Sequence, residues 1–415
     1  MTTKILYFIS VISFLFFLFI NIESPIKIQG DGVFYYSWAH SCFFDGDIDF
    51  KNEIKHFSDY DFYSKKFIDE NIVTKTGMIP NPYAFGTAII WMPFVAIAHW
   101  VSITFFYFTE NRLFFPDGYS YFYTLFVNLA TWAFGTTSFF LIFKNLKYYF
   151  SNKISLVTTI SLWLGTPWFY YQFLEPSMSH LASLFCMSAF FIFVCRILEK
   201  QKISFVYFFL LVFLAVAVRW QNIISIFVFW GVYNLDKERK EAENKISTLV
   251  IVAIASVLFL QAIAWRIIYG SLLLIPQGND FLFSDFYGIT TLFSSNRGLF
   301  FWSPILLLSL AGIFLWKKSK FISAVIGFSF LGQWIINSIL SDPGGGDAFG
   351  ARRFIEIIPF LAIPLAEAIK YFWNRKIIIL VAGLVSWSLF LLVGYHYDII
   401  PRFGNFNPFD VLRYI

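Results

Sequence analysis

Stretches of about 20 consecutive apolar residues recur along the chain, and each is long enough to cross a bilayer as a helix. Hydrophobic residues make up 58% of the chain and charged residues only 14%, whereas a soluble domain carries about 25% charged residues. The polar surface is therefore too small to face water on all sides, and the sequence lacks the alternating short segments of a membrane β-barrel. It predicts an all-helical protein that crosses the membrane many times.

The basic residues predict the orientation, because Lys and Arg collect on the cytoplasmic side. The basic clusters are Lys144/Lys147/Lys153, Arg196/Lys200/Lys202, Lys237/Arg239/Lys240/Lys245, Lys317/Lys318/Lys320 and Arg375/Lys376. The apolar runs between them are 3–22, 119–142, 154–172, 178–197, 203–217, 221–235, 246–268, 299–316, 321–340, 355–372 and 377–395. With a cytoplasmic N-terminus and an uncleaved first span, every cluster falls on the cytoplasmic face. This gives roughly eleven spans and an outer C-terminal tail.

The segment 85–107, "FGTAIIWMPFVAIAHWVSITFFY", is also long enough to cross. A full crossing would be a twelfth span and would push Lys144 and Lys147 outside, so we expect a re-entrant or interfacial helix on the outer side. No internal repeat or soluble domain is visible, and we expect one transmembrane domain over 1–415. The outer loops are 23–84, 173–177, 218–220, 269–298 and 341–354. They hold the polar chemistry, opposite the basic loops.

The first outer loop carries carboxylates on both sides of an aromatic stretch. Asp31 follows the first span, "VFYYSWAHSCFF" has the character of an interfacial helix, and Asp45, Asp47, Asp49 and Glu53 come after it. One interpretation is a solvated acidic loop with an aromatic belt helix. The other places a carboxylate at each end of the helix, with both facing a cavity at the outer leaflet.

This loop resembles that of the GT-C glycosyltransferases, which use polyprenyl-phosphate sugars, and in particular lipid A aminoarabinose transferases and protein O-mannosyltransferases. Their first outer loop carries Asp-Glu after the first span, a juxtamembrane helix, and then Gly-Asp; Asp31 and Gly46-Asp47 occupy these positions. The resemblance implies a GT-C-like bundle with Asp31 as catalytic base and Asp47 as supporting carboxylate. The family's Glu is Gly32 here, and its phosphate-binding Lys-Pro-Pro appears as Asn81-Pro82. Another cation must then hold the phosphate.

The stretch "SDPGGGDAFGARRFIEIIP", residues 341–359, offers that cation. Three consecutive glycines can bring backbone N–H groups close to an anion, and Arg352 and Arg353 can bind phosphate as planar forks. Asp347 could orient one of them. The alternative is that the arginines contact lipid headgroups beside a span. Arg219, in "VRWQN", and Arg297 are further candidates for the donor phosphate.

Other outer residues are candidates for sugar binding or for a metal. The loop 269–298 offers Gln277, Asn279, Asp280 and Asn296 as hydrogen-bonding partners for a sugar. Tyr287 in this loop and Trp302 after it could stack on a sugar ring. Many exposed loops contain such residues, so the pattern is not specific. The full set expected to bind substrate is Tyr35, Tyr36, Asp49, Asn81, Gln277 and Asp347. Glu175 and His180, in "FLEPSMSHLASLF", could hold a divalent cation. The remaining histidines show no ligand spacing with one another, and no cofactor is otherwise expected.

The sequence has no GxGxxG, P-loop, nucleophile elbow or HExxH, and its cytoplasmic loops are too short for a nucleotide-sugar domain. The expected function is transfer of a sugar from a polyprenyl-phosphate donor to a glycan, lipid or protein acceptor, with inversion, on the extracytoplasmic side of the inner (plasma) membrane. Membrane lipids, but no nucleic acid, are expected partners. The alternatives are a transporter or flippase of lipid-linked glycans, which should show repeats and broken helices, and a non-enzymatic assembly scaffold.

Overall fold

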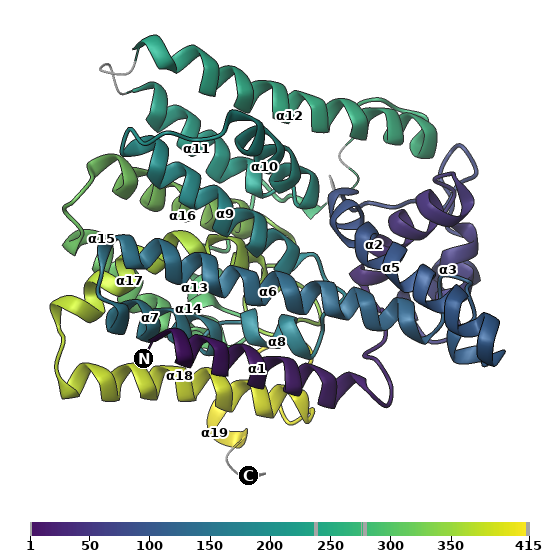
Figure 1. Ribbon diagram of the computed structural model, residues 1–415, viewed down its shortest axis with the longest axis horizontal. Coiled ribbons are helices and arrows are strands. Elements are labelled where there is room, and N and C mark those ends of the chain that lie inside the picture. The colour runs from purple at the N-terminus through teal and green to yellow at the C-terminus, as the bar shows by residue number, and fades with distance from the viewer. Residues whose placement is uncertain (1, 236–239, 275, 277–279, 412–415) are drawn as a thin grey trace.

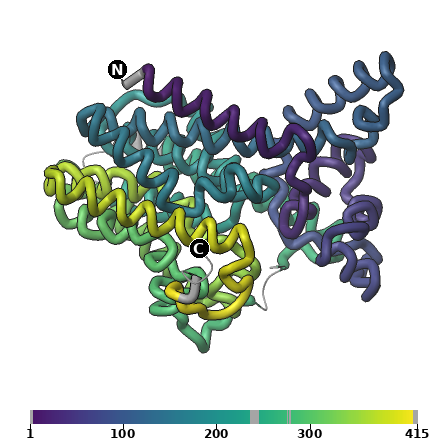
Figure 2. Tube along the Cα trace, turned by 90° about the horizontal axis from the view of Figure 1, so that it is seen from below, coloured from purple at the N-terminus to yellow at the C-terminus, as the bar shows by residue number. Residues whose placement is uncertain are grey.

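The computed structural model describes residues 2–235, 240–274, 276 and 280–411 (Figures 1 and 2). Within these residues the fold is helical, and the only strand-like pairing is an isolated antiparallel bridge between Phe281 and Leu340. Seven helices are long and apolar enough to cross a membrane by length and composition. The chain is therefore a multi-pass helical membrane protein, as its composition predicts.

The seven long helices are α1 (Thr2–Asn21), α5 (Gly86–Thr109), α6 (Tyr121–Tyr149), α9 (His180–Leu198), α12 (Lys240–Tyr269), α16 (Lys320–Ser338) and α18 (Arg375–His396). Shorter helices between them complete the bundle: α7 (Asn152–Leu164), α8 (Trp168–Phe173), α10 (Phe205–Val218), α11 (Asn222–Asn234), α14 (Leu299–Trp302), α15 (Ile305–Leu315) and α17 (Ile358–Tyr371). Each expected span coincides with one or two of these helices.

Two of the expected spans are interrupted, which the sequence analysis did not anticipate. The segment 154–172 breaks between α7 and α8 before Pro167, and 299–316 breaks between α14 and α15 before Pro304, because proline cannot donate the helical hydrogen bond. Ser388 on α18 lies between the two breaks. Its hydroxyl is 3.1 Å from the carbonyl oxygen of Gly165 and 2.9 Å from that of Trp302. The one proton of this buried hydroxyl is thus shared between carbonyls at the two interruptions, and it can donate to only one of them at a time.

Helix α17 forms the centre of the bundle. Almost every residue from Ile358 to Ile369 is buried, and α17 contacts α15, α7, α9 and α6. Its closest neighbour is α15, where a Cβ added at Gly312 would lie 1.9 Å from the carbonyl oxygen of Pro364. Only glycine permits this backbone approach.

Three of the loops that carry basic clusters, those after α6, α15 and α17, meet at one end of the bundle. The Nζ atom of Lys318 lies 3.2 Å from the carbonyl oxygen of Tyr149, and Lys370 Nζ lies 5.8 Å from the ring centroid of Phe150. The structure therefore gathers these clusters as the positive-inside rule requires. That this end is cytoplasmic stays a prediction.

The segment between α1 and α6 gathers at the opposite end of the bundle (Figures 1 and 2). It contains α2 (Asp31–His40), the π-helical turn η1 (Ser41–Asp45), α3 (Lys51–Phe57), α4 (Phe62–Asp69), α5 and the 3₁₀ turn η2 (Arg112–Phe114). Helix α5 packs on the N-terminal half of α6, where Phe94 contacts Phe134 and His99 contacts Tyr123. These contacts fit the expected outer position of 85–107, although α5 is also long enough to cross.

The remaining short elements are α13 (Gly288–Phe293), the 3₁₀ helix η5 (Arg352–Ile357) and α19 (Pro408–Val411). η5 leads directly into α17 and packs on α9 and α16. The two arginines predicted to bind phosphate are thus the first residues of a short helix that is anchored to the centre of the bundle.

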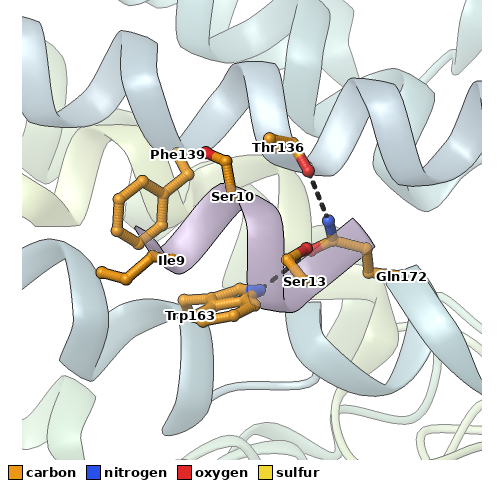
Figure 3. A pocket seen from close by; sticks show the side chains of 7 residues that line it. All are labelled: Ile9, Ser10, Ser13, Thr136, Phe139, Trp163 and Gln172. Carbon is orange, nitrogen blue, oxygen red and sulfur yellow. Dashed lines mark hydrogen bonds between the residues drawn. The ribbon is translucent and has the colours of Figure 1, made fainter. Parts of the chain in front are cut away.

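A polar pocket lies inside the bundle between α1, α6, α7 and α8 (Figure 3). Gln172 is buried there, accepts a hydrogen bond from Trp163 Nε1 at 2.9 Å, and donates to Thr136 Oγ1 at 3.1 Å. Because an unpaired amide in an apolar interior is costly, these bonds explain how the bundle accommodates Gln172. The lining of this pocket contains no carboxylate and no arginine.

Candidate functional site

Asp31 is the first residue of α2, and two glycines place it there. Gly30 has a φ of +56°, and its N–H donates to Asp61 Oδ1 at 2.7 Å. At Gly32 an added Cβ would lie 2.5 Å from the carbonyl oxygen of Ser177. The glutamate found here in the GT-C pattern would therefore not fit, which gives Gly32 a steric reason.

The carboxylate of Asp31 is held from two sides. Tyr83 donates its hydroxyl to Oδ1 at 2.7 Å, and Arg352 Nη2 lies 3.2 Å from Oδ2. The side chain of Asp31 is 28% exposed and that of Arg352 is 13% exposed. The structure thus brings together the carboxylate after the first span and an arginine 321 positions later, and it leaves the carboxylate accessible. Sequence analysis expected the arginine here but did not single out Tyr83.

Glu175 is buried beside this ion pair. Burial raises the pKa of its carboxyl to about 8, Arg352 acts against this shift, and Asp31 adds to it. Asp347 also raises the pKa of Glu175, and Arg402 lowers it. At neutral pH the group is largely protonated and adds little negative charge to the site.

Asp347 belongs to the same cluster through other partners. It accepts a hydrogen bond from Tyr395 at 2.6 Å and lies 3.6 Å from Arg402 Nη1. Its ion pair is thus with Arg402, where the sequence analysis expected Asp347 to orient Arg352 or Arg353. Tyr395 and Arg402 lie near and beyond the end of the last long helix, and no sequence motif marks them.

Arg353 forms no ion pair with the described residues, although the nearby carboxylates of Asp342 and Asp31 offset part of its charge. Its Nη1 donates to the backbone carbonyl of Asp342 at 2.6 Å, and no carboxylate oxygen of the described residues lies within 4.0 Å of it. Burial, and the like charge of Arg352, lower its pKa to about 10. The guanidinium lines a small pocket of about 10 Å³, which has room for about one water molecule. An anion that enters the pocket would stabilise this buried cation by pairing with its charge.

The glycine loop does not offer the backbone donors that the sequence predicts. The N–H groups of Gly344 and Gly345 both donate to Asp342 Oδ1 at 3.1 Å. The loop's own carboxylate therefore occupies two of the three glycine N–H groups. The positive φ of Gly345 and Gly346 serves the tight turn that lets Asp342 reach them.

Arg219 is buried in a network below the outer cluster and is not a free phosphate ligand. Its Nε contacts Glu356 Oε1, and its Nη1 donates to Ser179 Oγ at 3.0 Å and lies 3.1 Å from His180 Nδ1. Glu356 is 1% exposed. Its contact with Arg219 is an ion pair rather than a well-aligned hydrogen bond, because neither carboxylate oxygen has a partner of suitable geometry. Sequence analysis missed Glu356, although a carboxylate beside a span is a signal.

The pair proposed to hold a metal, Glu175 and His180, is separated by these partners. His180 Nδ1 faces the guanidinium of Arg219 at 3.1 Å, and a positive charge so close disfavours a metal cation on that nitrogen. The nearest charges that shift the pKa of Glu175 are instead those of Arg352 and Asp31. The contacts give no support to a shared cation here.

Arg297 also has a structural environment. It is 1% exposed, donates from Nε to the carbonyl of Ala348 at 2.6 Å, and contacts the carbonyl of Arg402. It lines the pocket beside Arg353 but mainly joins the glycine loop to the segment after α18.

Three expected sugar contacts brace α2 instead. Tyr35 accepts from Ser179 Oγ at 2.9 Å, Tyr36 donates to the carbonyl of Gly118, and Asn81 donates to the carbonyl of Phe34 at 2.9 Å. All three are buried. Of the remaining expected contacts, Gln277 lies outside the described residues.

Asp47 and Asp49 lie beyond the other end of α2. Asp47 is exposed and accepts from the N–H of Asp49 at 3.0 Å. The nine residues of α2 after Asp31, the five-residue π turn and Gly46 separate the two aspartates, a path of roughly 20 Å. The structure therefore does not bring Asp47 to the carboxylate of Asp31.

The arrangement at the outer end of the bundle is thus an accessible carboxylate with an arginine partner, a neutral buried carboxyl behind it, and an unpaired arginine lining a small pocket. It can accept a proton and bind an anion side by side. Comparison of the chain with protein-family models, curated proteins and solved structures finds no match.

Proposed function

We propose that the protein is an integral-membrane glycosyltransferase that moves a sugar from a polyprenyl-phosphate donor to an acceptor hydroxyl on the extracytoplasmic side, with inversion. The observation that carries this proposal is the contact of Asp31 Oδ2 with Arg352 Nη2 at 3.2 Å, beside the unpaired Arg353. Asp31 as the base and the two arginines as the anion site lie far apart in the sequence. They come together at the end of the bundle opposite the basic loops.

Asp31 has the accessibility and contacts that a general base needs. Its side chain is 28% exposed, so an acceptor hydroxyl can reach it, and the Tyr83 hydroxyl fixes its orientation. The acceptor oxygen attacks the anomeric carbon as its proton passes to Asp31. The bond from that carbon to the phosphate oxygen breaks with its electron pair, and the polyprenyl phosphate leaves as an anion without a general acid.

The arginines supply the charge that the leaving group requires. Arg353 has no carboxylate partner among the described residues, and Arg352 can exchange part of its contact with Asp31 for a phosphate oxygen. Negative charge grows on the phosphate as the sugar departs, so cations that are already in position stabilise the transition state. The largely neutral carboxyl of Glu175 avoids adding repulsion.

The test uses purified full-length protein in detergent with synthetic polyprenyl-phosphate hexoses and pentoses and a panel of acceptors. Asp31→Asn is expected to bind donor but to transfer at least about 100-fold more slowly, as for loss of a general base. Arg353→Met is expected to weaken donor binding by about 10-fold or more, as for loss of a charged hydrogen bond. Asp69→Asn, an exposed carboxylate on α4, is the control. A fully active Asp31→Asn enzyme would contradict the assignment.

One observation favours a transporter of lipid-linked glycans as the second candidate. The helices α7/α8 and α14/α15 are interrupted, and transporters often build their sites on interrupted helices. Liposomes separate the candidates: a transporter moves the intact donor between leaflets, and an enzyme in detergent releases polyprenyl phosphate only when acceptor is present.

A further inference from the structure

Three side chains of the first outer loop converge at the end of α2 away from Asp31. His40 Nδ1 lies 2.9 Å from Glu53 Oε1 and 3.3 Å from Asp45 Oδ2, and one ligand atom from each residue lies within 4.8 Å of the others. Among the described residues this is the one group of three or more His, Cys, Asp or Glu side chains with such a geometry. It uses none of the residues assigned to sugar transfer above.

The π-helical turn η1 is what brings two of these residues together. His40 and Asp45 are five positions apart, which in an α-helix would turn them about 140° away from each other. In the wider π turn, the N–H of Gly46 bonds to the carbonyl of Ser41 at 2.8 Å, and residues five apart come close to the same face. α3 then presents Glu53 to the pair from the other side.

The distances match those between ligands of one small cation. Nitrogen and oxygen ligands lie about 2.1 Å from Zn²⁺, so neighbouring ligand atoms are about 3.0 Å apart in an octahedral site and about 3.4 Å apart in a tetrahedral one. The two distances from His40 Nδ1, 2.9 and 3.3 Å, need almost no adjustment.

The surroundings hold the ligands in the state that a cation requires. His40 Nε2 lies 3.1 Å from the carbonyl oxygen of Asp117, which can only accept, so Nε2 keeps its proton. A cation would replace the proton that Nδ1 shares with Glu53 Oε1 at 2.9 Å, which gives the usual arrangement around metal-bound histidine. The His40 ring stacks between Phe44 and Tyr119 at centroid distances of 4.7 and 4.1 Å. On the far side, Asn52 Nδ2 donates to Asp45 Oδ2 at 2.9 Å.

Glu53 supplies an independent sign of a missing partner. The residue is fully buried, its Oε1 accepts from Ser41 Oγ at 2.6 Å, and its Oε2 is buried without any hydrogen-bond partner. The other oxygen of this carboxylate, Oε1, is the one that lies 2.9 Å from His40 Nδ1. A buried carboxylate oxygen without a partner is costly, and a cation would remove that cost.

We propose that His40, Asp45 and Glu53 bind one divalent transition-metal cation of the class of Zn²⁺ or Mn²⁺. One imidazole with two carboxylates suits these ions better than Mg²⁺ or Ca²⁺, which prefer oxygen ligands alone. The cation joins α2, η1 and α3, while the Asp117 carbonyl ties the site to the start of α6. It therefore stabilises the outer segment that carries Asp31 at its other end, and its role is structural.

The experiment uses tag-free full-length protein in detergent, stripped with chelator and then titrated separately with Zn²⁺, Mn²⁺ and Mg²⁺. Calorimetry is expected to show one site for Zn²⁺ or Mn²⁺, and binding is expected to raise the melting temperature. Asp45 is exposed, so Asp45→Asn should fold, and it is expected to weaken affinity about 10-fold or more. Glu53→Gln should lose the site as well, and Asp69→Asn is the matched control.

X-ray absorption at the Zn²⁺ edge identifies the ligands and is expected to show a single imidazole in an otherwise oxygen shell. Absence of one-to-one binding by both Zn²⁺ and Mn²⁺ would overturn the proposal and leave His40 and Glu53 as a buried ion pair. Equal affinity in wild type and Asp45→Asn, or a shell with two imidazoles, would place the bound ion elsewhere and overturn it too. None of these readouts depends on sugar transfer.

Discussion

Replacing Glu175 with glutamine is expected to remove a pH dependence that this buried carboxyl imposes on stability. Burial raises its pKa to about 8 from an ordinary value of 4.5. Arg352 and Arg402 act to lower the pKa, and Asp31 and Asp347 act to raise it. Because the pKa is higher in the folded state, the stability linked to this group is present below about pH 4.5 and is lost as the pH rises through about 8.

The size of the effect follows from the same shift. One pKa unit corresponds to about 1.4 kcal/mol, so full ionisation of Glu175 costs at most about 5 kcal/mol of unfolding free energy. The residue is only 9% exposed, so solvent screens little of this cost. With an unfolding entropy of about 2 cal/mol/K per residue, 5 kcal/mol corresponds to about 6 °C in melting temperature for this chain.

The assay is tryptophan fluorescence during thermal unfolding in detergent, from pH 5 to pH 9. Glu175→Gln and wild type are expected to melt within about a degree of each other at pH 5 and to separate by up to about 6 °C at pH 9, with the variant more stable. Glu23→Gln, which changes an exposed carboxylate, should follow wild type throughout. Parallel curves for wild type and Glu175→Gln would refute the reasoning, because they would mean that the carboxyl ionises without penalty.

Two further predictions concern the bundle and one concerns α2. Gly312→Ala is expected to destabilise the protein by about 3 kcal/mol or more, because its Cβ would overlap the Pro364 carbonyl; Gly327→Ala, where nothing lies within 4 Å, is the thermal-melt control. Ser388→Ala is expected to cost about 1–3 kcal/mol by removing the one hydroxyl proton that the carbonyls at the two helix breaks share, and Ser388→Thr should recover part of the melting temperature. Gly32→Ala is expected to displace the start of α2 from Ser177 and to lower both the melting temperature and the transfer rate. Normal values of both would contradict the conclusion that a Cβ does not fit at this position.

The helices and the gathering of charges at one end were predictable because they depend on local properties. Apolar length determines where a span can form, and the basic loops determine which ends face together. That logic placed Asp31 and Arg352 at the same end before any contact was known. It could not place the helix breaks, since prolines are tolerated in membrane helices and only the packing of Ser388 shows how the open carbonyls are satisfied.

The roles of individual charged residues were less predictable, because each depends on a partner far away in the sequence. Arg219 and Arg297 lie in segments predicted to be outer loops, as Arg353 does, yet one is neutralised by Glu356 and the other is buried among backbone carbonyls. The carboxylates divide in the same way: Asp45 and Glu53, which follow α2, lie against His40 and do not join Asp31. Residue type and loop position alone cannot separate these cases.

Pairing therefore distinguishes the charges that maintain the fold from the charge that is available to a substrate. A membrane protein cannot leave an ion unpaired in a low-dielectric region without a cost of several kcal/mol, and most of the arginines at the outer end have that cost offset within the chain. Arg219 has Glu356, Arg352 has Asp31, and Arg402 has Asp347. Arg353 has a backbone carbonyl but no ion pair among the described residues. Burial and Arg352 lower its pKa, and Asp342 offsets only part of this shift. An anion that binds next to Arg352 removes this cost and competes for the contact that holds Asp31, so donor binding would free the base at the same moment as it fills the pocket.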